Sequence, residues 1–144
     1  MIIELAQGKD KQNIAKLDSH IPSPCLGECI GNGHVYVLKD DSIRNGGSNP
    51  VVGVLRYSLF WQSIPFLDLL YIDEAYRGKG FGSHMMSEWE QAMKIRGYRY
   101  VMTSTQADEE AWRFYEKLGY HQVGGFFPPE QEAEEWMYVK ELGK

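Results

Sequence analysis

The sequence predicts an α/β fold, with a mixed central sheet of about seven strands and helices on both faces. Short apolar runs of strand length recur along the chain, and segments with helical periodicity separate several of them. One strand-to-helix connection is rich in glycine. The 144 residues suffice for one substantial core, so we expect a single domain over 1–144.

The first half of the chain is expected to hold two short helices among its strands. Apolar residues at helical spacing indicate the helices, and alternating or β-branched runs indicate the strands. The expected elements are a strand over 1–6, helices over 9–17 and 25–30, and strands over 35–39 and 51–60 that form a hairpin.

The second half is expected to alternate between strands and helices. A crossover helix between two strands favours a parallel pairing of those strands. Asp108 is a plausible N-cap, and Gly97 and Gly119 are plausible helix ends. The expected elements are strands over 66–72 and 100–105, helices over 80–96 and 109–118, and final strands over 120–126 and 135–141.

Composition argues against several classes of partner. The chain has 20 acidic and 15 basic residues, so it lacks the overall positive field that non-specific nucleic-acid binding uses. It shows no secretory signal pattern and no apolar run of membrane-spanning length, so we expect a cytoplasmic protein without a membrane partner. Cys25 and Cys29 are expected to be buried free thiols, and the scattered histidines predict no metal site.

The segment Asp73 to Ser83 has the features of a phosphate-binding turn. It joins an apolar strand to an amphipathic helix, and a helix start offers unpaired N–H groups and a positive dipole end. Gly78, Gly80 and Gly82 are expected to allow close approach and positive φ angles. Arg77 and Lys79, in the same segment, add positive charge and hydrogen-bond donors.

Two sequence motifs together resemble the GNAT N-acetyltransferase superfamily. The spacing fits neither a P-loop nor the Rossmann fingerprint. The run Arg77-Gly78-Lys79-Gly80-Phe81-Gly82, after Leu-Tyr-Ile-Asp, is similar to the acetyl-CoA signature of that superfamily. The downstream run Ala111 to Tyr120 is similar to its Ala-x-x-Phe-Tyr-x-x-x-Gly-Phe pattern. With the strand order, the resemblance covers nearly the whole chain.

The resemblance implies an acetyl-CoA co-substrate and names its contacts. The strand ending at Ile72 would splay from the one containing Ser104, and the pantetheine would lie in the gap. The implied cofactor-binding residues are Leu70, Tyr71, Ile72, Arg77, Gly78, Lys79, Gly80, Phe81, Gly82, Ser83 and Tyr115. Many relatives have Asn where this chain has Asp108, for which we expect helix capping instead of a cofactor contact.

Tyr115 and Asp68 are the candidate catalytic residues. In relatives the tyrosine that matches Tyr115 often protonates the departing thiolate, whereas the alternative is a core aromatic residue. A Glu at the position of Asp68 acts as a base in some relatives, and a carboxylate within an apolar strand is costly to bury without a role. Glu28 and Asp73 are lesser candidates for the base, a structural role for Asp68 is the alternative, and a partly deprotonated amine would need no strong base.

The expected function is transfer of acetyl from acetyl-CoA to a primary amine by direct attack, with a small amine favoured. The acceptor pocket would be built from 22–30, 40–50 and 126–135, which carry no diagnostic motif. The acyl-chain length and a homodimeric state are left open. The alternatives are a non-catalytic acyl-CoA-binding regulatory module and a nucleotide-phosphate binder of unrelated fold.

Overall fold

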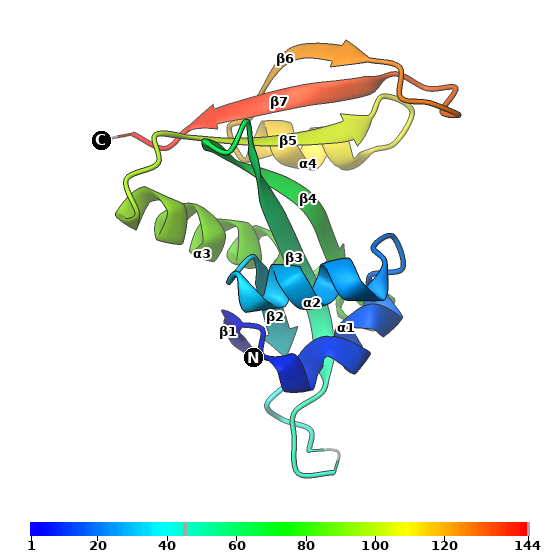
Figure 1. Cartoon of the computed structure of the whole chain (residues 1–144), viewed down its shortest axis with the longest axis vertical. Coiled ribbons are helices and arrows are strands. Elements are labelled where there is room, and N and C mark those ends of the chain that lie inside the picture. Colours follow the sequence, from blue (N-terminus) through cyan, green and yellow to red (C-terminus); the bar gives the residue numbers. More distant parts are fainter. Residues whose placement is uncertain (45, 144) are drawn as a thin grey trace. The chain divides into compact units, whose positions relative to one another are not determined.

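The structure is a computed structural model that describes residues 1–44 and 46–143 (Figure 1). Its strands are β1 (Ile2–Leu5), β2 (Val35–Lys39), β3 (Val51–Phe60), β4 (Ile64–Ile72), β5 (Tyr100–Gln106), β6 (His121–Phe126) and β7 (Glu135–Glu141). Its α-helices are α1 (Lys11–Leu17), α2 (Ser23–Gly31), α3 (Phe81–Ile95) and α4 (Ala111–Lys117), with short 3₁₀ turns η1 (Gly8–Asp10) and η2 (Glu74–Tyr76). The predicted mixed α/β architecture is confirmed.

The strands form one mixed sheet in the order β1-β2-β3-β4-β5-β7-β6. Strands β4 and β5 are parallel, with Phe66 opposite Met102 and Leu67 opposite Thr103. This confirms the parallel pairing that the crossover through α3 predicts. Strand β7 pairs antiparallel with both β5 and β6.

The chain divides into two compact units. Unit 1 comprises Met1–Ser58 and Leu69–Trp89, and unit 2 comprises Leu59–Asp68 and Glu90–Lys144. Strands β3 and β4 and helix α3 therefore each contribute residues to both units. The expectation of one domain over 1–144 stays a prediction.

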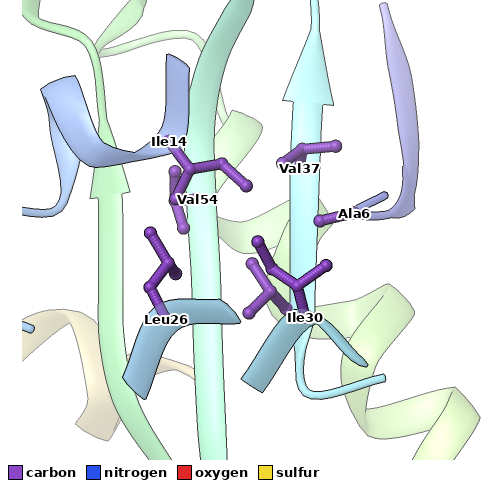
Figure 2. Packing of buried hydrophobic residues seen from close by; sticks show 7 residues of the cluster. Ala6, Ile14, Leu26, Ile30, Val37 and Val54 are labelled. Atoms are coloured by element: carbon purple, nitrogen blue, oxygen red, sulfur yellow. The ribbon is translucent and has the colours of Figure 1, made fainter. Parts of the chain in front are cut away.

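In unit 1, helices α1 and α2 cover one face of strands β2 and β3. Ile14, Leu26 and Ile30 pack with Val37 and Val54 in a buried cluster (Figure 2). These strand residues share a face because side chains alternate along a strand. Tyr57 lies on the opposite face of β3 from Val54, and the centre of its ring is 5.7 Å from the centre of the Trp89 ring. Both faces of β3 are therefore covered within unit 1.

In unit 2, helix α4 packs against β5. The buried residues of this unit include Val101 and Thr103 of β5, Tyr115 of α4, Tyr138 of β7 and Tyr120, which precedes β6. Several of these buried side chains carry hydroxyl groups, which need hydrogen-bond partners when they are removed from water. The core of unit 2 is therefore more polar than the aliphatic cluster of unit 1.

Two local expectations, the N-cap at Asp108 and the buried cysteines, differ from the structure. Helix α4 begins at Ala111, after a turn over 107–110, and its N-cap is Glu110, so the prediction of Asp108 as N-cap is wrong. Cys25 is exposed and Cys29 half-buried, because the buried face of α2 is the one that carries Leu26 and Ile30. At Gly53 the strand is both bulged and tightly packed, because the β2–β3 register shifts beside Leu38 and an added Cβ would lie 3.0 Å from Leu38 Cβ.

Candidate active site

The glycine turn in unit 1 starts from a fixed strand end. The Asp73 backbone N–H donates to the Val52 carbonyl at 2.8 Å, which ties the residue after β4 to β3. The Asp73 carboxylate accepts from the Ala75 N–H at 3.1 Å and caps η2. The direction in which the turn leaves the sheet is therefore set by two hydrogen bonds of Asp73, one from its N–H and one to its carboxylate.

Arg77 connects the turn back to the end of β4. Its Nε donates to the Ile72 carbonyl at 2.8 Å, and its guanidinium lies 5.1 Å from the centre of the Tyr71 ring. A hydrogen bond through Nε and a cation–π contact fix the plane of the guanidinium. The Lys79 ammonium similarly lies 5.8 Å from the centre of the Tyr76 ring. Two cations are thus held beside the turn.

The glycines divide into two kinds. Gly78 has φ 76° and Gly80 has φ 84°, which confirms the expected left-handed conformations. Gly82 is the second residue of α3 and is helical, so the expectation of a positive φ at Gly82 is wrong. Because α3 begins at Phe81, Gly82 lies inside the first helical turn and needs no left-handed conformation.

The start of α3 presents backbone donors. Its first hydrogen bond runs from the His84 N–H to the Gly80 carbonyl at 3.1 Å. The N–H groups of Phe81, Gly82 and Ser83 precede this bond, and the first N–H groups of a helix have no acceptor within it. The residues from Arg77 to Gly80 are all exposed to solvent. The geometry provides donors, two cations and the positive end of a helix dipole for an anion such as a diphosphate.

A hydrogen bond links the turn to the β2–β3 hairpin. The Tyr76 hydroxyl donates to the Asp40 carboxylate at 2.6 Å, and the Ser42 hydroxyl donates to the same group at 2.6 Å. Both bonds lower the pKa of Asp40, and the bond from Ser42 has the larger effect. The pKa of Tyr76 is raised, mainly by its hydrogen bond to Asp40. The hairpin therefore supports the turn through one carboxylate.

A polar groove of about 500 Å³ also lies in unit 1, between α1, the hairpin and the first residue of the turn. Its charged lining groups are Lys16 and Asp73, and the complete lining is Asn13, Lys16, Leu17, Ser48, Asn49, Pro50, Val51 and Asp73. Of the three segments expected to build an acceptor pocket, only 40–50 contributes to this groove.

Tyr115 of α4 lies in the core of unit 2. It is 8% exposed, and its ring meets the Tyr120 ring edge-on at 5.7 Å. Burial raises the pKa of Tyr115 to about 12, and a hydrogen bond with Thr103 acts in the opposite direction. The phenol therefore keeps its proton at neutral pH.

Tyr120 is itself held by charged groups. Its hydroxyl donates to Glu90 at 2.7 Å, and the Lys140 ammonium donates to the other oxygen of Glu90 at 2.7 Å. Burial is the main reason that the pKa of Tyr120 is raised, and the charge of Glu90 adds to it. Thr103, Glu90 and Lys140 were missed by sequence reasoning, because no local motif marks partners that lie 30 to 50 residues apart.

The candidate bases have different environments. Asp68 on β4 belongs to unit 2 and is exposed, so a cost of burial does not apply to it. Glu28 on α2 is exposed, and Asp73 is half-buried with its carboxylate already accepting from Ala75. Geometry within the units does not single out one base.

Metal-binding clusters and membrane-spanning helices are both absent from the described residues. In that part of the chain, no three His, Cys, Asp or Glu side chains gather as a metal ion would require. Across residues 1–44 and 46–143, no helix combines the length and the apolar character needed to cross a bilayer.

Unit 2 holds the parallel β4–β5 pair of an α/β protein, and in unit 1 the turn before α3 has donors and cations suited to an anion such as a diphosphate. The sequence model of the Acetyltransferase (GNAT) family matches residues 11–120. The chain belongs to this family, and it is an acyl-CoA-dependent N-acetyltransferase. No curated protein sequence matches the chain.

Solved structures share the fold at low sequence identity. The ribosomal-protein-S18-alanine N-acetyltransferase from Escherichia coli has a TM-score of 0.78 at 13% identity, covering 99% of this chain and 94% of its own. An aminoglycoside 6'-N-acetyltransferase complexed with coenzyme A has a TM-score of 0.82 at 15% identity, and the match covers 100% of this chain and 98% of that one. Ard1 from Thermoplasma volcanium has a TM-score of 0.82 at 18% identity, and the match covers 99% of this chain and 98% of that one. At these identities the likeness establishes the fold.

Proposed function

We propose that the protein transfers an acetyl group from acetyl-CoA to a primary amine on a small molecule, by direct attack of the amine in a ternary complex. The observation that carries this proposal is the turn before α3, with Arg77 bound to Ile72 and left-handed glycines at 78 and 80. A structural neighbour was solved as a complex with coenzyme A, which supports the choice of co-substrate.

The turn would bind the diphosphate of the co-substrate. The backbone N–H groups from Gly78 to Ser83 would donate to its oxygens, and Arg77 and Lys79 would balance its charge. The residues at the end of β4, Leu70, Tyr71 and Ile72, would offer backbone groups to the pantetheine. The Ile72 carbonyl already accepts from Arg77, so its second lone pair, or the amide N–H, would serve there.

Tyr115 would act as the acid toward the leaving thiolate. A phenol with a pKa of about 12 holds its proton at neutral pH and so can donate a hydrogen bond. Because a thiol has a reference pKa of about 8.5, complete transfer from this phenol is uphill. Tyr115 would therefore stabilise the developing negative charge mainly as a hydrogen-bond donor. Backbone N–H groups near Tyr71 would stabilise the oxyanion.

Asp68 is the proposed base for the acceptor ammonium. Its exposed position on β4 allows a proton to be accepted directly or through a water molecule. Glu28, Asp73 and water remain the other candidates. An amine acceptor is cationic before it reacts, which agrees with the net charge of −5. Positioning of the two substrates would supply most of the rate enhancement.

The experiment is an acceptor screen that measures thiol release from acetyl-CoA over a panel of polyamines, aminoglycosides, amino acids and peptides. The proposal predicts turnover with at least one small amine and loss of most turnover in Tyr115→Phe, with coenzyme A affinity retained. A non-catalytic acyl-CoA-binding module predicts coenzyme A binding and no acceptor. A general nucleotide-phosphate binder predicts equal affinity for ADP and coenzyme A, and turnover only with peptides would overturn the choice of a small acceptor.

A further inference from the structure

The sheet of unit 2 has one face covered by α4 and another face that carries a half-buried carboxylate. The centres of the Trp136 ring of β7 and the Trp112 ring of α4 are 6.1 Å apart, so α4 covers the face of Trp136. Side chains alternate along a strand, and residues directly opposite in neighbouring strands share a face. Ser104 of β5 lies opposite Met137 and therefore belongs to the other face. Glu135, two residues before Met137 on β7, shares that face and is half-buried.

Asp68, the proposed base, lies on the same face as Ser104. The parallel ladder of β4 and β5 ends with Leu67 opposite Thr103. The next residues of the two strands are Asp68 and Ser104. By alternation their side chains share the face that α4 leaves uncovered, where Asp68 is exposed and Ser104 half-buried. This face therefore carries Asp68, Ser104 and Glu135 on the strands β4, β5 and β7, which are neighbours in the sheet.

Two neutral side chains hold the Glu135 carboxylate. The Ser104 hydroxyl donates to Oε2 at 2.7 Å, and the Gln131 side-chain amide donates to Oε1 at 3.1 Å. The Gln131 amide also donates to the Ala133 carbonyl at 2.9 Å, which fixes it within the loop before β7. Because the two bonds reach different oxygens, the plane of the carboxylate is fixed and each oxygen keeps a lone pair for another donor.

The negative charge of Glu135 has no cationic partner within residues 1–44 and 46–143. In the same unit, Glu90 is paired with Lys140 at 2.7 Å. Asp40 in unit 1 is also held by neutral donors, but it accepts three hydrogen bonds where Glu135 accepts two. Burying a charge is costly without a counter-charge or full hydrogen bonding. Glu135 is therefore suited to a cationic ligand.

The chemistry of acetyl transfer decides which cation this is. A carboxylate stabilises the charged form of a neighbouring amine, and an ammonium group has no lone pair with which to attack a thioester. Glu135 is therefore suited to a cationic group of the acceptor that does not react, whereas the reacting amine would lie at Asp68. Neighbouring strands are about 4.8 Å apart, so the Glu135 carboxylate, which contacts Ser104, lies roughly 5–10 Å from Asp68. A short diamine spans such a separation.

We propose that Glu135 binds a second, non-reacting ammonium group of the acceptor, and that Ser104 and Gln131 position its carboxylate for this contact. The acceptor is accordingly a small molecule with two or more amino groups, such as a diamine or a polyamine. This substrate class rests on the proposed transfer of acetyl to a small primary amine, which it makes more specific.

The test uses three acceptors that share one reacting amine and differ in charge at the other end. Putrescine has a second ammonium group, its amino alcohol analogue has a neutral hydroxyl there, and γ-aminobutyrate has a carboxylate. Thiol release from acetyl-CoA measures kcat/KM for each. Per reacting amine, the parent protein should prefer putrescine over the amino alcohol by about tenfold or more, as expected for a hydrogen bond between charged groups. It should use γ-aminobutyrate least, and equal values for the three acceptors would overturn the inference.

Glu135→Gln removes the charge and keeps the shape of the side chain, and its amide oxygen can still accept from Ser104. This variant should lose the preference for putrescine over the amino alcohol. Glu132→Gln is the matched control, because it makes the same change at an exposed residue of the loop before β7 and should retain the preference. A full preference in Glu135→Gln would contradict the inference. Equal losses in the two variants would also contradict it, because they would show a general effect of net charge.

Two further results separate this inference from the proposed function. Equal kcat/KM for all three acceptors would leave the proposed function intact and overturn the second ammonium site. If no small amine is acetylated, the proposed function fails, and calorimetry on the protein bound to coenzyme A then decides the inference. The parent protein should bind putrescine more tightly than the amino alcohol, and equal affinities would contradict the site.

Circular dichroism identifies variants with an intact fold. If Glu135→Gln does not fold, the order of the three acceptors in the parent protein is the test, because it needs no substitution. An order of putrescine, amino alcohol and γ-aminobutyrate supports the site, and any order that places γ-aminobutyrate first overturns it.

Discussion

The Nε atom of Arg77 donates a 2.8 Å hydrogen bond to the carbonyl oxygen of Ile72, the last residue of β4. The bond closes a loop of a few residues over η2 and fixes the guanidinium beside the proposed diphosphate site. Stacking on Tyr71 restricts its plane further. Arg77 therefore has both a structural bond and terminal N–H groups that can serve a ligand.

Arg77→Ala should weaken coenzyme A binding about tenfold to a hundredfold, because hydrogen bonds from a charged group are typically worth about 1.5–3 kcal/mol. Arg77→Lys should recover only part of this affinity, since an ammonium has no planar fork to bond Ile72 and a phosphate together. Isothermal calorimetry measures both. Equal affinity in the alanine variant and the parent would contradict the role assigned to Arg77.

Gly78→Ala and Gly80→Ala should each destabilise the turn by about 1 kcal/mol and weaken coenzyme A binding, because both glycines have positive φ angles. An added Cβ would meet nothing within 4 Å at either position, so the effect is conformational and not a clash. Gly8→Ala is the matched control, with open space and no positive φ. The urea midpoint of Gly8→Ala should be higher than the midpoints of Gly78→Ala and Gly80→Ala. Equal midpoints in the three variants would argue against the left-handed turn.

The sequence was informative where a pattern is local. Val35–Lys39 and Val51–Phe60 were predicted with their observed bounds, because strand-forming runs end at polar or glycine-rich segments. Helix α3 was expected over 80–96 and spans Phe81–Ile95, since its apolar face and Gly97 mark both length and end. The parallel β4–β5 pairing followed from the crossover rule.

The sequence failed where local rules compete or partners are distant. Asp108 has N-cap chemistry, but a turn over 107–110 delays the start of α4. Gly82 looks like the third glycine of a loop, yet the helix has already begun there. The Glu90–Lys140 and Thr103–Leu67 contacts depend on the pairing of β5, β7 and the segments beside them, which no local pattern encodes.

At acidic pH the β2–β3 hairpin should stabilise the turn less than it does at neutral pH. The pKa of Asp40 is lower in the folded protein than in the unfolded chain, mainly because Ser42 and then Tyr76 donate to it. Its contribution to stability is therefore complete above the ordinary carboxyl pKa and is lost as the pH falls through the lower, folded value. Asp40→Asn should lower the urea midpoint at neutral pH and flatten its decline in acid.

Tyr76→Phe should reproduce part of that effect, because it removes one of the donors to Asp40 and leaves Ser42 in place. The measurement is the urea midpoint of parent, Asp40→Asn and Tyr76→Phe from neutral pH into the acid range. A parent and an Asp40→Asn variant whose midpoints fall in parallel would rule out the role of the Asp40 carboxylate.

Glu90→Ala should destabilise the protein by about 1–3 kcal/mol, because it leaves the Tyr120 hydroxyl and the Lys140 ammonium without their shared acceptor. Glu88→Ala on the same helix is the control, since the Glu88 side chain is 57% exposed and faces only His84 at 3.6 Å. Thermal or urea unfolding compares the two. A control variant as unstable as Glu90→Ala would show that helix propensity, and not the buried contact, determines the loss.

We propose above that the turn before α3 binds the diphosphate of an acyl carrier. Calorimetry should compare coenzyme A with pantetheine, which lacks the diphosphate, on the parent protein and on Arg77→Ala. We expect the parent to bind coenzyme A clearly and pantetheine only weakly, and we expect Arg77→Ala to lose affinity for coenzyme A alone. No affinity for coenzyme A, or equal affinity for the two ligands, would contradict it.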